Sequence, residues 1–149
     1  MDYSDNVEIV RNKLKGQVPL IGHMAVDIVE YEPCKVVVSA PLEPNINTHG
    51  TAFGGSLYCV ATMAGWSLVH LSLMDAGYEP NVWVTKGEVA YLKPVTHEIK
   101  AVAEIDEAAL DLFLKAFKSK GKARTTIRVV VHCDEQTAVT LNVEFAAMI

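Results

Sequence analysis

A chain of 149 residues, half of them hydrophobic and 21% charged, has the composition of one globular domain with a full-sized core. The net charge of -5 and the absence of any Lys/Arg cluster exclude general nucleic-acid binding. Cys34, Cys59 and Cys133 are odd in number and far apart, which predicts reduced thiols rather than a disulfide framework or a zinc site. We therefore expect a single cytoplasmic domain over residues 1–149.

The first quarter of the chain predicts one helix and a β-hairpin. Apolar residues recur at helical spacing over Asp5–Lys15, and Gly16 is the expected stop. Pro19 is expected to break the chain before Met24–Glu30, which alternates as a strand. A β-branched run at Val36–Val38 predicts the second strand of the hairpin.

The longest apolar segment, Leu57–Met74, approaches the length of a membrane span. It lacks basic anchors at its ends and contains several small or polar residues, namely Cys59, Thr62, Gly65, Ser67, His70 and Ser72. A helix that is apolar on all sides is buried in the core of a protein or in a membrane. These flanks and polar residues favour a buried core helix and no membrane span.

The second half predicts four strands and one helix. The strands are expected over Val82–Leu92, His97–Ile105, Lys122–Cys133 and Thr137–Ala147, and the helix over Asp106–Lys120. Asp106 is the expected N-cap of that helix and Gly121 its C′ residue. This order predicts an α+β fold, in which one curved antiparallel sheet wraps around the long central helix.

A polar, glycine-bearing loop over residues 47–56 leads into the central helix. Unpaired N–H groups and the positive dipole end of a helix N-terminus suit a developing oxyanion, so Gly54 and Gly55 are candidate donors. The alternative is that these glycines only permit close packing of helix on sheet. Asn47 could hydrogen-bond an attacking water or a substrate, or it could simply turn the loop.

The element order and two motifs resemble hotdog-fold acyl-CoA thioesterases, and in particular thioesterases of the YiiD C-terminal type. The motifs are Asn47-x-x-Gly50-Thr51-x-Phe53-Gly54-Gly55 and Tyr91-Leu92-Lys93-Pro94-Val95. The resemblance implies a hotdog fold and hydrolysis of an acyl-CoA or acyl-carrier thioester. Coenzyme A would then be part of the substrate, with no separate cofactor. A half-curled sheet also leaves an exposed edge, so we expect a homodimer or dimer of dimers with shared sites.

One position departs from the family pattern. Many related thioesterases carry a carboxylate nine residues after the aromatic or histidine residue that precedes the Gly-Gly pair. Counting from Phe53 places Thr62 there, and threonine can orient a water but cannot act as a general base near neutral pH. Glu88, in the third predicted strand, is the candidate replacement, although a solvated surface glutamate is the plainer interpretation.

The catalytic candidates are therefore Asn47, Thr62 and Glu88, and the substrate-binding candidates are His49, Phe53, Gly54 and Gly55. The missing carboxylate leaves open a non-catalytic acyl-CoA binding module. A hotdog hydratase or dehydratase, with His49 and Glu88 as the acid–base pair, is a further alternative. The other histidines, His23, His70, His97 and His132, lack ligand spacing with each other, so no metal is expected.

Overall fold

The computed structural model describes residues 3–149 of the chain. The elements are α1 (Tyr3–Gln17), α2 (Pro19–Met24), β1 (Asp27–Glu32), β2 (Lys35–Ala40), a 3₁₀ turn η1 (Glu43–Asn45), α3 (Gly54–Asp75), β3 (Asn81–Tyr91), β4 (Ile99–Glu104), α4 (Glu107–Lys120), β5 (Lys122–Cys133) and β6 (Gln136–Met148). The six strands form one sheet in the order β1-β2-β4-β5-β6-β3, and every neighbouring pair is antiparallel.

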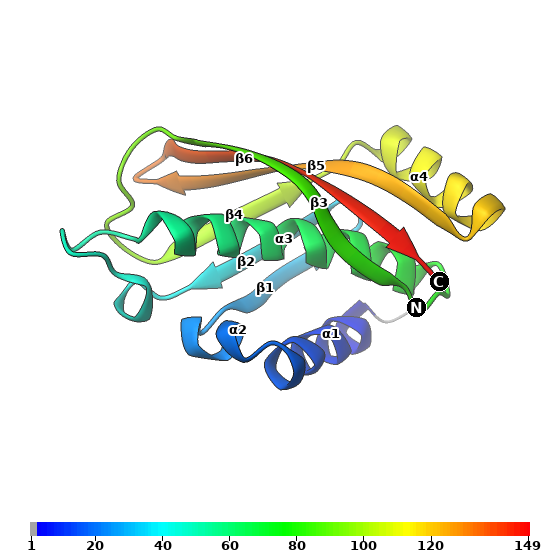
Figure 1. The fold of residues 1–149 in the computed structure, drawn as a ribbon, viewed down its shortest axis with the longest axis horizontal. Coiled ribbons are helices and arrows are strands. Elements are labelled where there is room, and N and C mark those ends of the chain that lie inside the picture. Colours follow the sequence, from blue (N-terminus) through cyan, green and yellow to red (C-terminus); the bar gives the residue numbers. More distant parts are fainter. Residues whose placement is uncertain (1–2) are drawn as a thin grey trace.

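The sheet curves around α3, as Figure 1 shows, while α1 and α2 lie beneath β1 and α4 lies beside β5. This arrangement confirms the predicted α+β fold with a curved antiparallel sheet around a long central helix. The N-terminus of α3 and the loop before it project at the end of the molecule that is farthest from the C-terminus.

The central helix α3 is buried along most of its length. By length and composition it could cross a membrane, but 72% of its most apolar window is buried inside the protein. Leu68, Leu71 and Leu73 are fully buried. Burial of this apolar surface contributes on the order of 2 kcal/mol for each such side chain. The prediction of a buried core helix is confirmed.

The start of β1 and the chain before it differ from the sequence-based expectation. The chain breaks before Pro19 as expected, since α1 ends at Gln17 and Val18 is not helical, but Pro19 then begins α2, where its fixed φ and missing N–H are tolerated at the first helical position. Ile21 and Met24 are buried on this short helix, which ends at Ala25 in the left-handed region with φ of 57°. The strand therefore begins at Asp27 rather than at Met24.

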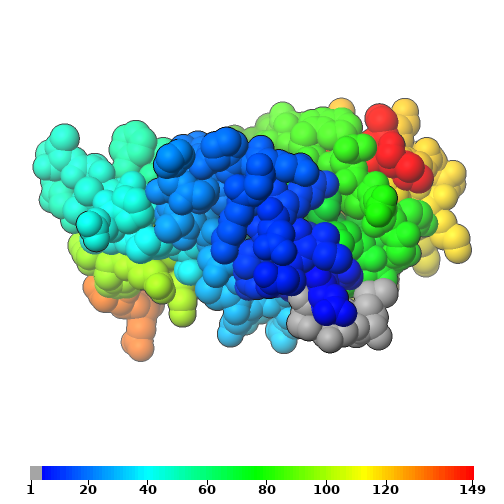
Figure 2. Space-filling view, turned by 90° about the horizontal axis from the view of Figure 1, so that it is seen from below, coloured from blue at the N-terminus to red at the C-terminus, as the bar shows by residue number. Residues whose placement is uncertain are grey.

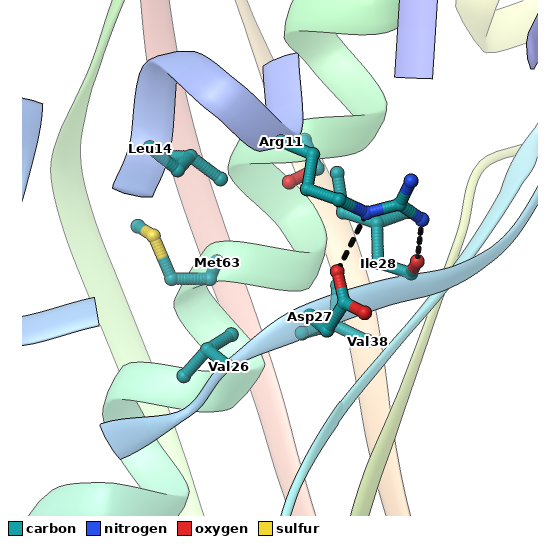
Figure 3. Close-up of a pocket in the computed structure, with 8 residues that line it drawn as sticks. Arg11, Leu14, Val26, Asp27, Ile28, Val38 and Met63 are labelled. Carbon is teal, nitrogen blue, oxygen red and sulfur yellow. Dashed lines mark hydrogen bonds and ion pairs between the residues drawn. The ribbon is translucent and has the colours of Figure 1, made fainter. Parts of the chain in front are cut away.

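Arg11, drawn in Figure 3, links helix α1 to the first strand of the sheet. Its Nε donates to Asp27 Oδ1 at 2.7 Å, and a second guanidinium nitrogen donates to the Ile28 carbonyl at 2.6 Å. Beneath this contact lies a cavity of about 10 Å³, lined in part by Met63 and Ser67. Such a space is close to the minimum for one water and far too small for an acyl chain.

Gly65 sets how closely α3 approaches the sheet. A methyl group there would stand 2.8 Å from Phe145 Cε2 and 3.2 Å from Val143 Cγ1, and Phe145 is fully buried. We expect Gly65→Ala to lower the free energy of unfolding by about 1–3 kcal/mol through overpacking, measured by urea denaturation. Gly16→Ala is the matched control, since open space surrounds Gly16 in α1 and alanine favours the helix. Equal stability of both variants would contradict this packing.

Candidate active site

The loop between η1 and α3 is an ordered structure closed by its own backbone. Ile46 and Ala52 form an antiparallel bridge, and the Asn47 N–H donates to the Thr51 carbonyl at 2.8 Å. Gly50 turns the tip with φ of 81°, a conformation that glycine adopts without strain. The loop thus presents residues 47–51 as a compact tip at the entrance to α3.

The Asn47 side chain holds this tip together from inside. Its Oδ1 accepts the N–H groups of His49 at 2.8 Å and Thr51 at 3.1 Å. Its Nδ2 donates to Thr51 Oγ1 at 2.8 Å and to the Ala52 carbonyl at 3.5 Å. An amide oxygen has two lone pairs and an amide nitrogen two protons, so the loop itself occupies all four positions. In the single chain this amide organises the loop.

We predict that Asn47→Ala lowers kcat/KM about tenfold, which is about 1.4 kcal/mol of transition-state stabilisation. The melting temperature should change little, because the loop is exposed and water can replace the lost hydrogen bonds. Asn47→Asp is the matched control, since a carboxylate still accepts the two N–H groups. Recovery of activity in Asn47→Asp would show that the bonds accepted by Oδ1 are sufficient, whereas an equally impaired Asn47→Asp would show that the Nδ2 donor is needed, either within the loop or toward substrate or water. Full activity of Asn47→Ala in a thioester assay would remove both roles.

A second asparagine, Asn45, anchors the base of the loop, and the sequence analysis missed it. Its side chain is 2% exposed, and Nδ2 donates to the carbonyls of Met24 at 2.9 Å and Pro41 at 2.8 Å. Its backbone carbonyl accepts the Phe53 N–H at 2.7 Å. On the opposite side, the Ala52 N–H donates to the Val95 carbonyl at 2.8 Å. The loop is therefore braced by α2 on one side and by the segment before β4 on the other.

The N-terminus of α3 offers three N–H groups with no acceptor among the described residues, those of Gly54, Gly55 and Ser56. Phe53 is the N-cap and makes no side-chain capping bond, while the Leu57 N–H already donates to the Phe53 carbonyl at 2.9 Å. Free donors at the positive end of a helix 22 residues long form an anion site by geometry and dipole together. These are the groups that the sequence analysis expected at Gly54 and Gly55.

Aromatic side chains surround this helix end. Phe53 is 56% exposed, and its ring lies over Gly55, where a methyl group would stand 2.5 Å from Phe53 Cε2. The Tyr91 hydroxyl donates to the Gly54 carbonyl at 2.9 Å, which fastens the end of β3 to the start of the helix. Burial, and secondarily the nearby Tyr58, raises the pKa of Tyr91, so its phenol remains a neutral donor.

Tyr58 is a site residue that the sequence analysis did not identify. It lies one turn after Gly54 on α3, and its hydroxyl oxygen is 2.0 Å from where a methyl group on Gly87 of β3 would stand. Gly87 therefore leaves room for the Tyr58 phenol between helix and strand. The only signal in the sequence was a tyrosine four residues after a helix start.

Thr62 does not lie beside the helix N-terminus of its own chain. At 1.5 Å per residue it is roughly 12 Å along the axis from Gly54. Its side chain is 8% exposed, and its hydroxyl donates to the Tyr58 carbonyl one turn earlier at 2.8 Å. A role for Thr62 at the free N–H groups would therefore require those groups to come from a second subunit.

His49 and Glu88 lie apart from each other. His49 is exposed at the loop tip, where its backbone N–H donates to Asn47. In β3, Gly87 contacts α3 and Val89 packs on the core, so Glu88 between them is on the outer face of the strand. The single chain thus brings together Asn47, Phe53, Gly54 and Gly55, with His49 at the edge, and separates Thr62 and Glu88 from them.

The opposite half of α3 borders a larger open cleft of about 590 Å³, between α1 and the start of β3. His70 lines this cleft, and burial, with Lys13 as a second cause, lowers its pKa to about 4. Its ring is therefore neutral near pH 7 and stacks on Trp66, with ring centroids 4.5 Å apart. Since His70 lies roughly 24 Å along the helix from Gly54, this cleft is separate from the loop site.

Comparison with known proteins agrees with the fold. The family described as "Putative thioesterase (yiiD_Cterm)" matches residues 7–149. A protein of unknown function from Chlorobaculum tepidum TLS has a TM-score of 0.92 and 32% identity, over 97% of this chain and 95% of that one. A "putative thioesterase" from Shewanella oneidensis has a TM-score of 0.85 and 23% identity, over 98% of this chain and 99% of the other. A thioesterase from Haemophilus influenzae has a TM-score of 0.71 and 13% identity, over 95% of this chain and 90% of the other.

Proposed function

The chain belongs to the thioesterase family of the YiiD C-terminal domain, and from this premise we propose that it hydrolyses acyl thioesters at the N-terminus of α3. The observation that carries the proposal is the row of free N–H groups at Gly54, Gly55 and Ser56 behind an ordered loop. Family membership supports thioester hydrolysis in general. We further propose that the thioester substrate is an acyl-CoA or an acyl-carrier protein.

In the proposed reaction the thioester carbonyl oxygen accepts hydrogen bonds from the α3 N–H groups. Water attacks the carbonyl carbon, the C–S bond breaks, and the thiolate leaves and takes up a proton that the water gave up. One well-placed backbone donor contributes about 3–4 kcal/mol of transition-state stabilisation. Exposed Phe53 and Tyr91 beside these donors supply apolar surface for the acyl or pantetheine part. Coenzyme A is thus substrate, and the proposal includes no other cofactor.

A single chain places neither Thr62 nor Glu88 beside the free N–H groups of α3. Both remain our candidates for the group that positions the water. The proposal therefore includes a site shared between two subunits, as the sequence analysis expected. Tyr58 joins the candidates, because its hydroxyl lies between α3 and β3 and has no hydrogen-bond partner among the described residues.

We propose that β3 is the strand through which two chains associate. It is 11 residues long, forms one edge of the sheet, and exposes most of its length, including Trp83 and Val84 at 44% and 40%. A long exposed apolar edge strand is a template for pairing with another chain. A homodimer built there would cover this edge, and two such dimers could form a tetramer.

Light scattering at micromolar concentration should therefore give at least the mass of a dimer. Val84→Lys should shift the population toward monomer, because a lysine on an edge strand opposes pairing. Leu112→Lys, on α4 at 69% exposure, is the matched control and should leave the mass unchanged. A wild-type monomer would contradict both the dimer and the shared site.

Incubation with a panel of acyl-CoAs, with detection of free thiol, tests the function. Hydrolysis releases coenzyme A, and this is the expected result. Two other outcomes would replace the proposal. Binding without thiol release would indicate an acyl-CoA binding module, which the threonine at position 62 makes a real competitor. Hydration of an enoyl chain without release would indicate the hydratase. A cytoplasmic location, where acyl-CoA and reduced thiols coexist, stays a prediction.

A further inference from the structure

Three side chains of metal-ligating types meet at the tip of the β5–β6 hairpin. Cys133 is the last residue of β5, Asp134 begins the turn, and His97 comes from the segment that leads into β4. Figure 2 shows the hairpin tip, in orange, protruding beside this yellow-green segment. One ligand atom from each residue lies within 4.8 Å of the others.

The separations among the three groups are short. Cys133 Sγ is 3.3 Å from His97 Nε2, His97 Nε2 is 3.2 Å from Asp134 Oδ1, and Cys133 Sγ is 3.8 Å from Asp134 Oδ2. Zinc bonds of about 2.3 Å to sulfur and about 2.0–2.2 Å to nitrogen and oxygen place the corners of a tetrahedron roughly 3.4–3.6 Å apart. The Cys133–His97 separation is therefore already near that of two corners. The two carboxylate distances end on different oxygens, so the exposed Asp134 side chain must turn to bring one oxygen to the third corner.

The surroundings of His97 also favour metal binding. Its Nδ1 lies 3.3 Å from the Glu98 carbonyl, which would accept the Nδ1 proton of the tautomer whose Nε2 lone pair faces Cys133 and binds a metal. A backbone carbonyl on the remote ring nitrogen is the usual support of a metal-bound histidine. Cys133 itself is 1% exposed, and its sulfur points at this nitrogen.

The hairpin turn directs the carboxylate toward the same point. Asp134 and Glu135 have φ of 53° and 65°, the two positive values of a type I′ turn. Aspartate tolerates this left-handed conformation better than most residues. Asp134 therefore follows Cys133 directly and still faces His97, with 72% of its side chain exposed.

We propose that Cys133, His97 and Asp134 bind a divalent cation of the zinc class. The ligands are the Cys133 thiolate, the neutral imidazole Nε2 and the Asp134 carboxylate, whose two negative charges balance the metal. On binding, the thiol proton of Cys133 passes to solvent. The fourth position is for water, beside Thr96 Oγ1, which is 3.7 Å from the sulfur. Thiolate and imidazole ligands favour zinc over magnesium or calcium.

Such a metal would fasten the segment before β4 to the hairpin. The same segment carries Val95, whose carbonyl braces the active-site loop at Ala52. Binding would thus stabilise the folded chain and the support of the loop, and this effect does not depend on the proposed hydrolysis. The sequence analysis expected no metal because it compared cysteines with cysteines and histidines with histidines. His97 lies 36 residues before Cys133, and the three ligands are of different residue types.

Titration of the EDTA-treated protein with Zn²⁺ and with Co²⁺ tests the proposal. We expect one equivalent to bind, with proton release, and Co²⁺ to show a thiolate charge-transfer band. At a free zinc concentration about 100 times Kd, the melting temperature should rise by about 5–10 °C. Binding of no metal above the level of a buffer blank would overturn the proposal and leave only a surface contact between His97 and Asp134.

Ligand variants separate this site from other thiols and histidines. Cys133→Ser, His97→Ala and Asp134→Asn each remove one ligand, and asparagine still fits the left-handed turn. Each should weaken zinc binding at least about 100-fold, since even the loss of a supporting contact costs 10–100-fold. His132→Ala, on the exposed neighbour of Cys133, and Cys59→Ser are the controls and should bind normally. Unchanged affinity in the three ligand variants would place the metal elsewhere and overturn the assignment.

Discussion

Gly54→Pro should lower kcat for thioester hydrolysis by about 10²–10³-fold, the effect of losing one oxyanion donor. Proline deletes the Gly54 N–H, yet the first helical position tolerates its ring. Phe53 before it has φ of -64° and ψ of 134°, the extended conformation that a residue preceding proline prefers. The helix and the loop should therefore persist while one donor is lost. Steady-state kinetics with an acyl-CoA that the wild type cleaves measures the effect.

Gly54→Ala is the matched control, because it keeps the N–H and adds only a methyl group. That methyl would stand 3.7 Å from the Tyr91 ring, which is ordinary contact. We expect Gly54→Ala to retain most activity and Gly54→Pro to retain the wild-type melting temperature. Equal activity of the two variants would show that the Gly54 N–H does not donate to the oxyanion. The N–H groups of Gly55 and Ser56 would then have to stabilise it.

Thr62→Asp should lower the free energy of unfolding by several kcal/mol, because it places a carboxylate at a position that is 8% exposed. Association of two chains can only reduce that exposure further. Thermal or urea unfolding measures the loss, and it should be larger at neutral pH than at low pH, where the carboxyl is protonated. A stable Thr62→Asp protein with increased thioesterase activity would contradict this expectation. It would place Thr62 in a wet acyl cleft, as the family pattern implies.

Thr62→Val separates catalysis from packing at the same position. The valine keeps the shape and loses only the hydroxyl that donates to the Tyr58 carbonyl. Ser72→Ala is a matched control, since the Ser72 hydroxyl makes the same kind of bond to the Leu68 carbonyl farther along α3. A fall in kcat in Thr62→Val but not in Ser72→Ala would support Thr62 as a water-orienting group. Full hydrolysis in both variants would remove it from the site.

The sequence determined the elements whose signals are local. The apolar run Leu57–Met74 had to be buried because it carries no polar face, and it became α3. Asp106 and Gly121 mark the ends of α4, the latter with φ of 72° as a C′ glycine requires. The loop motif at residues 47–55 also located the helix N-terminus correctly, because glycines and a helix start adjoin in the chain. The sequence analysis placed the break at Pro19 but missed the short helix α2, because a proline that ends one segment can also begin a helix.

Only the tertiary structure decided which side chains meet. The face of β3 that Glu88 occupies follows from the pairing register with β6, since a shift of one residue would turn it inward. The internal bonds of Asn47 and the place of Tyr58 over Gly87 depend on how loop, helix and strand pack. His97, Cys133 and Asp134 meet because the curved sheet brings the start of β4 to the end of β5. Spacing along the chain carries no such information, because long-range contacts are set by strand order and packing rather than by local propensity.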